Sequence, residues 1–163
     1  MLELKKELNI EQKRLFHRWL KKAIRQKDKD LFESIVETVG KEWHVFRNVK
    51  SGDFPKFANN LWKHIGDIKK GSYLWCDSQY QAYSYESKIC FLINPSGYKL
   101  IYDDNIKTIL MAEKKLKKFT DLSIDKKNWQ EVVMAYYKNC VKSKPLKTED
   151  FFKIDCNLWA KAV

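Results

Sequence analysis

The sequence has little of what a turn-rich β fold or a membrane protein needs. It contains 5 glycines and 3 prolines in 163 residues, and the period-two alternation of a half-buried strand is hard to find in it. It also lacks an apolar run of about 18 residues, the length of a membrane-spanning helix. The N-terminal stretch Met1 to Lys6 has no signal-peptide core. We therefore expect a soluble, mainly helical chain that stays in the cytoplasm and has no membrane partner.

Several common catalytic and metal-binding patterns are also missing. The sequence has no G-x-S-x-G, no glycine-rich phosphate loop and no H-E-x-x-H. Its cysteines form no C-x-x-C pair and have no histidine at zinc-ligand spacing: Cys76, Cys90, Cys140 and Cys156. We expect reduced thiols, no structural metal and no cofactor. Three histidines lie apart on predicted helices without a carboxylate partner, and we interpret them as surface or partly buried helix residues: His17, His44 and His64.

What the chain has in quantity is apolar and basic residues. Hydrophobic residues make up 44% and aromatic residues 14% of the sequence, which is enough for a packed core. Lys and Arg outnumber Asp and Glu by 32 to 21, giving a net charge of +11. A positive field attracts polyanions through counterion release, so nucleic acid, DNA before RNA, is the first partner to expect. The alternative is that lysines only keep helix surfaces soluble.

Apolar residues recur at helical spacing along most of the chain. We predict one domain over residues 1–163, an all-α orthogonal bundle of about seven helices. Asp30 is the expected N-cap of the second helix, Asp103 of the fifth and Asp125 of the sixth. The predicted helices cover approximately these ranges: 10–27, 30–46, 54–65, 78 or 84–93, 103–112, 125–140 and 148–159.

The segment that stands out runs from Ser87-Lys88 to Asp103. Lys88 begins a stretch that is otherwise apolar, and Asn94-Pro95 must break the helix that follows. Burial among apolar neighbours and the positive end of the helix dipole both favour the neutral amine of Lys88, the form that a nucleophile needs. Asp103, at a helix N-terminus, should stay ionised and stabilise positive charge on a sugar. The alternative is that Lys88 is a surface lysine and Asp103 only a helix cap.

The order of these elements resembles the helix-hairpin-helix DNA glycosylases of the 8-oxoguanine class, and more closely their small bacterial relatives. The matching parts are Ser87-Lys88, Pro95, the step from Leu100 to Asp103, and Ile154 to Trp159 near the C-terminus. The resemblance implies that Lys88 forms a Schiff base and that Asp103 is the catalytic aspartate. It also implies base flipping into a pocket where aromatic side chains stack on the base.

Four residues before or beside the lysine are expected to bind the substrate: Trp75, Tyr83, Tyr85 and Ser87. The three aromatic residues have core packing as their alternative role. The sequence departs from the family in two places. Tyr83-Ser84-Tyr85-Glu86 stands where a Gly-x-Gly hairpin would hold a DNA phosphate, and Glu86 would add negative charge there or cap the helix. The spacing from Lys88 to Asp103 is also about one helical turn short.

Two further interpretations stay open beside a lyase-type glycosylase. The chain is alternatively a non-catalytic helical module that binds nucleic acid through its charge, with salt-sensitive and sequence-indifferent affinity. It is alternatively a protein that binds a protein partner, whose basic character serves solubility.

Overall fold

The computed structural model describes residues 1–50, 52–141 and 145–162, and within them it contains helices, turns and no strand. The all-helical prediction is confirmed at this level. The described residues form nine α-helices where about seven were expected. Their bounds are α1 Leu2–Gln26, α2 Lys29–Glu42, α3 Phe54–Lys63, α4 Ile65–Lys70, α5 Tyr83–Ile93, α6 Pro95–Tyr98, α7 Asp104–Lys117, α8 Trp129–Cys140 and α9 Thr148–Lys161. Two short 3₁₀ segments, Phe46–Asn48 and Trp75–Asp77, lie between them.

The two additional helices arise at His64 and Pro95. His64, with φ −100° and ψ 13°, ends α3 and precedes α4, so the predicted third helix divides there. Asn94 ends α5, as expected before a proline, but Pro95 then begins the short α6. Proline suits this place because its fixed φ fits the first helical position. The Asn94 side chain accepts a hydrogen bond from Gly97 N and thereby caps α6.

Three predicted helix starts need correction. α1 begins at Leu2, eight residues earlier than expected. The sequence did not predict these first turns because their apolar residues, including Leu4 and Leu8, are exposed and form no apolar stripe at helical spacing. The N-cap of α2 is Asp28, not Asp30: its carboxylate accepts a 2.9 Å bond from Leu31 N. α8 begins at Trp129, since Asp125 accepts bonds from two amides in the preceding turn.

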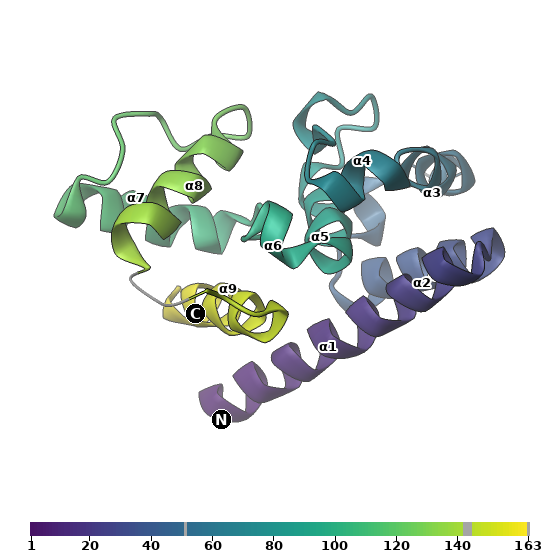
Figure 1. Ribbon diagram of the computed structural model, residues 1–163, viewed down its shortest axis with the longest axis horizontal. Coiled ribbons are helices and arrows are strands. Elements are labelled where there is room, and N and C mark those ends of the chain that lie inside the picture. Colours follow the sequence, from purple (N-terminus) through teal and green to yellow (C-terminus); the bar gives the residue numbers. More distant parts are fainter. Residues whose placement is uncertain (51, 142–144, 163) are drawn as a thin grey trace.

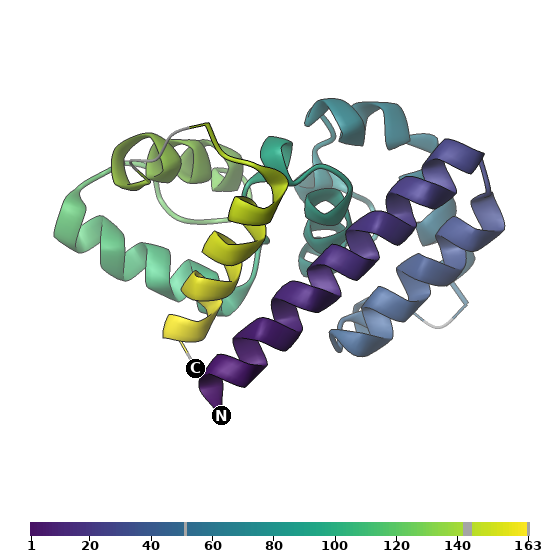
Figure 2. The ribbon, with the colours of Figure 1, turned by 60° about the horizontal axis from the view of Figure 1, so that its bottom comes forward.

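α5 lies at the centre of the molecule. Every residue of this helix from Tyr85 to Ile93 is buried, and its neighbours include α1, α2, α4 and α6 (Figure 1). α1, the longest helix, packs between α2 and α9, so the first and last helices of the chain lie side by side (Figure 2). One hydrophobic core runs from Phe16 in α1 to Leu158 in α9. The fold therefore brings α5, α1 and α9 together around one region.

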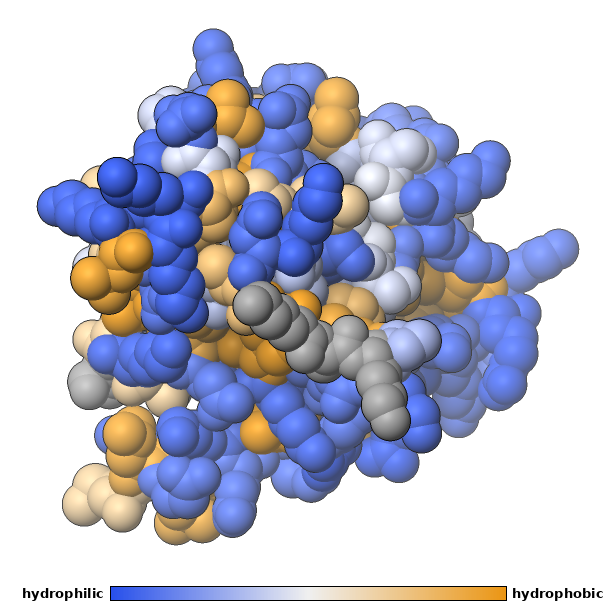
Figure 3. Space-filling model, turned by 60° about the vertical axis from the view of Figure 1, so that its left-hand side comes forward, coloured by the Kyte–Doolittle hydropathy of each residue, from blue (hydrophilic) through white to orange (hydrophobic). Residues whose placement is uncertain are grey.

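The side of the molecule that carries α7 and α8 is covered largely by hydrophilic residues, with apolar ones in small groups (Figure 3). None of the helices in the described ranges combines the length and apolar character needed to cross a lipid bilayer.

Candidate functional site

Lys88 is held on α5 with its amine in a nearly closed environment. Its side chain is 9% exposed, and its Nζ donates a 2.9 Å hydrogen bond to Ser84 Oγ, one turn earlier. The same Nζ lies 3.5 Å from Asp103 Oδ2. Lys88 is therefore a buried lysine with a carboxylate partner, and the alternative of a surface lysine is wrong.

Burial is the main influence on Lys88. It lowers the pKa of the amine because the charged form loses its hydration, while the carboxylate of Asp103 acts in the opposite direction. Lys88 is the sixth of the eleven residues of α5, so it does not begin the helix as the sequence suggested. The helix dipole acts mainly within the first turn. Burial therefore accounts for the lowered pKa without the dipole contribution that we expected.

Asp103 is placed by its own helix and by Ser87. It is the N-cap of α7, as predicted, and its Oδ1 accepts a 2.9 Å bond from Asn105 N. The preceding residue, Tyr102, donates its backbone N–H to Ser87 Oγ at 3.0 Å. Ser87 is 1% exposed, so its hydroxyl joins the Asp103 segment to α5 and has almost no surface to offer a substrate. This hydrogen bond between neighbours of the two residues holds Asp103 close to Lys88, although fewer residues separate them in the sequence than in the family that the chain resembles.

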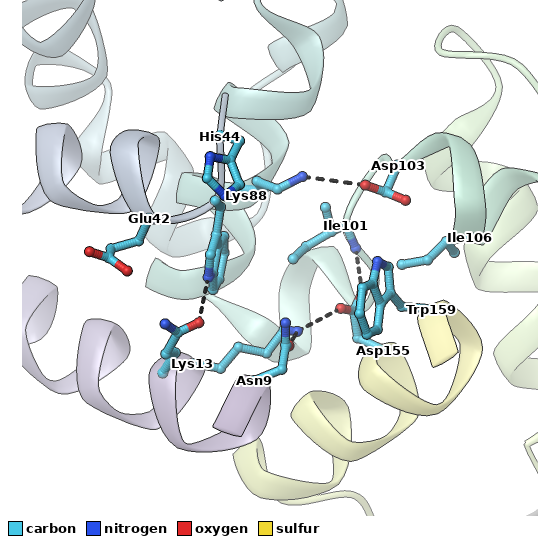
Figure 4. Close-up of a pocket in the computed structure, with 12 residues that line it drawn as sticks. Asn9, Lys13, Glu42, His44, Lys88, Ile101, Asp103, Ile106, Asp155 and Trp159 are labelled. Carbon is cyan, nitrogen blue, oxygen red and sulfur yellow. Dashed lines mark hydrogen bonds and ion pairs between the residues drawn. The ribbon is translucent and has the colours of Figure 1, made fainter. Parts of the chain in front are cut away.

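Lys88 and Asp103 face a pocket of about 270 Å³ formed by α1, α5, α9, the end of α2 and the start of α7. Figure 4 shows the two side chains at one end of this pocket, with Lys13 and Asp155 at the other. The lining residues are Asn9, Gln12, Lys13, Glu42, Trp43, His44, Lys88, Ile101, Asp103, Ile106, Asp155 and Trp159. The volume lies slightly below the range of about 300–1,000 Å³ typical of ligand sites, which suits one heterocycle.

A second buried ion pair closes the far end of the pocket. Lys13 Nζ lies 3.2 Å from Asp155 Oδ2, and both side chains are less than 5% exposed. Burial opposes the charge of Lys13, but Asp155 and the contact with Cys156 outweigh it and raise the pKa of the lysine. Asp155 Oδ1 also accepts a 2.8 Å bond from Ile101 N. Because Ile101 is two residues before Asp103, this pair helps to fix the carboxylate that faces Lys88.

Two tryptophans that sequence reasoning did not select supply the aromatic wall of the pocket. Trp43 follows α2, and its Nε1 donates a 3.0 Å bond to Gln12 Oε1 on α1. Trp159 comes from α9 and lies across the pocket near Ile106 (Figure 4). His44 also lines the pocket; it has φ 56° and lies beyond the end of α2, so it is not the helix residue we expected.

The aromatic residues selected from the sequence lie elsewhere. Tyr85 is fully buried between α2 and α5, where its hydroxyl donates to Val36 O. Trp75 is 4% exposed and packs 5.1 Å from the ring of Tyr102. Both have the packing role that was their alternative. Tyr83 lines a neighbouring hollow of about 410 Å³, which shares His44 and Asp103 with the pocket.

Residues 83–86 form the first turn of α5 and not a hairpin. Glu86 points inward and is fully buried, with Oε1 accepting a 2.9 Å bond from the hydroxyl of Tyr73. Its Oε2 has no hydrogen-bond partner among the described residues. Burial raises the pKa of Glu86 to about 7. The expectation that Glu86 adds negative charge to a phosphate-binding surface, or caps the helix, is therefore wrong.

The sequence did contain a signal for Lys13. It lies three and seven residues before Phe16 and Leu20, on the apolar stripe of α1, where a lysine needs a buried partner. Asp155 lies in the C-terminal step that carried part of the resemblance. Nothing in the sequence joined the two, because α1 and α9 stand at opposite ends of the chain.

The four cysteines are free thiols, and two of them, Cys90 and Cys156, are buried. Within residues 1–50, 52–141 and 145–162, no group of three or more His, Cys, Asp or Glu side chains is arranged to hold a metal ion.

Comparisons of the chain with protein-family models, with curated proteins and with solved structures find no match.

Proposed function

We propose that the protein binds DNA and acts on a damaged or unusual nucleotide through an imine formed by Lys88. The observation that carries the proposal is the amine of Lys88, 9% exposed and 3.5 Å from Asp103, facing a pocket of about 270 Å³. A buried lysine with a lowered pKa is a recognised kind of nucleophile. A carboxylate beside it suits a reaction in which positive charge develops on a sugar.

In the proposed reaction, the lone pair of Lys88 Nζ attacks the anomeric carbon of the nucleotide. The bond from that carbon to the base breaks, and its electron pair leaves with the base. Asp103 stabilises the positive charge on the sugar while this bond breaks. The attacking nitrogen gives up one proton, which the departing base takes up. The nitrogen lone pair then forms the C=N bond as the bond from the anomeric carbon to the ring oxygen breaks, and that oxygen takes up the second proton of the amine. Water hydrolyses the resulting imine and restores the free amine.

The pocket offers groups for holding the base. Trp43 and Trp159 present aromatic surfaces, and the extruded bases of such reactions stack on aromatic side chains. The side chains of Asn9, Glu42 and His44 offer hydrogen-bonding atoms at the same pocket. The net charge of +11 supplies the general attraction for a polyanion.

Sodium borohydride tests the proposal because it reduces an imine to a stable amine. We expect the native chain to form a covalent adduct with duplex DNA that carries a damaged base, and Lys88→Ala to form none. Lys88→Met is the second variant, since it removes the amine but keeps an unbranched apolar side chain in the buried site. Lys115→Ala, at an exposed position on α7, is the control and should trap like the native chain.

The second candidate function is a non-catalytic module that binds nucleic acid by charge. The observation that favours it is the pairing of Lys88 with both Ser84 and Asp103, which also suits a purely structural ion pair. Two results together would favour this alternative. The native chain and Lys88→Met would bind nucleic acid with the same salt dependence, and neither would form a trapped adduct on a broad panel of lesions.

A further inference from the structure

A basic groove lies on α1, away from the Lys88 pocket. It has a volume of about 600 Å³, and five of its seven lining residues are cations. No carboxylate of the described residues lines it. The lining residues are Arg18, Lys21, Lys22, Ile24, Arg25, Lys69 and Ile93.

The charge of α1 is divided along the helix. Its three carboxylates all lie between Leu2 and Glu11, whereas residues 12–27 hold seven cations and no carboxylate. Lys13 is paired with Asp155 and Arg14 with Glu149. Within the described ranges, none of the four α1 cations that line the groove makes an ion pair. The groove therefore carries positive charge that no carboxylate of the described chain neutralises.

Helix termination explains only part of this charge. Cations suit the negative end of a helix dipole only within about the last turn, and of the α1 residues in the groove only Arg25 is a cation of the last turn. Arg18 lies two turns earlier. Lys69 comes from a different helix, α4, and is a cation of its last turn, so the dipole accounts for Arg25 and Lys69 but not for Arg18, Lys21 and Lys22. The cations converge on one hollow from two helices, which suits an anionic ligand.

The spacing of the cations along α1 favours a ligand with several phosphates in a row. Arg18 and Arg25 are seven residues apart, about 10 Å along a helix with a rise of about 1.5 Å per residue. One strand of duplex DNA carries a phosphate about every 3.4 Å along the axis, and because the strand winds around the axis its phosphates lie farther apart than that, so this length reaches about two neighbouring phosphates. The two arginines offer guanidinium groups for bidentate phosphate contacts. The groove has two apolar lining residues, the half-buried Ile24 and Ile93, which is 7% exposed, whereas a membrane-bound helix would need a broad apolar face.

The groove and the pocket lie on different sides of α1. Lys13 lines the pocket and Lys22 the groove, and nine residues at about 100° each place them half a turn apart around the helix. We infer that the α1 groove, with Arg18, Lys22, Arg25 and Lys69, is a second nucleic-acid surface that binds phosphodiester backbone independently of the Lys88 pocket. The inference rests on the proposed function only for the class of partner, not for the chemistry at Lys88.

The test measures binding of the full chain to an undamaged 20-base-pair duplex over a range of salt concentrations. The variant is Arg18→Gln/Lys22→Gln/Arg25→Gln. The control, Lys56→Gln/Lys63→Gln/Lys138→Gln, removes the same charge from exposed positions on α3 and α8. Each phosphate contact contributes about 0.9 to the slope of log K against log salt. We expect the groove variant to lower the slope by about 2–3, and the control to change it by less than 1.

Equal slopes for the native chain and the groove variant would overturn the inference. A loss of binding to vesicles of phosphatidylcholine and phosphatidylserine, with no change in the DNA slope, would overturn it too and assign the groove to a lipid surface. Borohydride trapping is measured separately on the same variants. If the native chain forms the trapped adduct but the groove variant keeps the native salt slope, only the inference about the groove fails. If the groove variant has a lower slope but the native chain forms no trapped adduct, only the proposal for Lys88 fails.

Discussion

The chemistry of Lys88 depends on its neighbour as much as on its burial. Desolvation lowers the pKa of the amine and Asp103 raises it, so the carboxylate keeps more of the lysine charged than burial alone would. In the proposed reaction, the same carboxylate faces the positive charge that develops on the sugar. Under that proposal Asp103 reduces the supply of neutral amine but stabilises the breaking of the bond to the base.

Asp103→Asn separates the catalytic role of this residue from its capping role. Asparagine caps helices about as well as aspartate, so the cap should be kept, and any fall in unfolding temperature reports the lost partner of the buried Lys88. Loss of the negative charge should slow base release by about 100-fold or more. It should also shift the rising limb of the pH–rate profile to lower pH, because the pKa of Lys88 falls further without the carboxylate.

Single-turnover rates between pH 5 and pH 9, with thermal unfolding of the same samples, measure both effects. Asp104→Asn is the matched control, since this exposed neighbour lies in the first turn of α7. A native rate for Asp103→Asn would remove Asp103 from the mechanism.

Glu86 makes folding depend on pH. Its pKa is raised to about 7 in the folded chain from an ordinary value of 4.5. Between these values the folded state keeps a proton that the unfolded state has lost, so its contribution to stability is present below about pH 4.5 and falls as pH rises through 7. We expect Glu86→Gln to show a smaller loss of unfolding temperature between pH 5 and pH 8 than the native chain. Glu7→Gln, at an exposed position, should keep the native pH dependence, and an equal dependence in Glu86→Gln would contradict the account.

Residue types and local spacing were enough to find Lys88, Asp103 and the cap that Asp103 makes. They were not enough to find the wall of the pocket. Trp43 and Trp159 belong to α2 and α9, and only the packing of α1 against both helices brings them together. Trp75 and Tyr85 were close to Lys88 in sequence, but the direction of each side chain around its element takes it into the core.

At the scale of elements, the packing of α2 against α5 holds in place the helix that carries Lys88. Gly40 of α2 faces the ring of Tyr85 on α5, and a Cβ at this position would overlap the tyrosine hydroxyl. Because Tyr85 is fully buried, the ring has no space into which it can move.

Gly40→Ala should therefore destabilise the fold by about 1–3 kcal/mol, the usual effect of overpacking a core. Chemical denaturation measures this change. Gly66→Ala is the matched control on α4, where a Cβ meets no atom within 4 Å, and it should be neutral or slightly stabilising. Equal stability of the two variants would show that the close contact between Gly40 and Tyr85 does not hold α2 against α5.

The helical class and most helix positions followed from apolar periodicity and from Asn94-Pro95. The errors fall where the deciding interaction is local and polar. The first turns of α1 lack an apolar stripe, and Asp28 competes with Asp30 for the same cap. The turn at Asp125 is stabilised by its own hydrogen bonds, which delays the start of α8 to Trp129.

At the scale of the whole molecule, the two proposed roles, chemistry and backbone binding, belong to two separate regions. The pocket between α1, α5 and α9 holds the amine proposed to react, and the groove on another side of α1 holds cations that make no ion pair within the described residues. α1 contributes residues to both regions, so the proposed backbone binding and the proposed chemistry lie on different sides of one helix.

The location of the covalent bond tests the central claim most directly. Any exposed amine can react with the aldehyde of an abasic site, so the position of the adduct is more informative than its existence. The native chain is incubated with abasic-site duplex and borohydride, digested, and analysed by peptide mass spectrometry. We predict that the reduced adduct lies on Lys88. An adduct on Lys13, the N-terminal amine or exposed lysines, with Lys88 unmodified, would contradict the account.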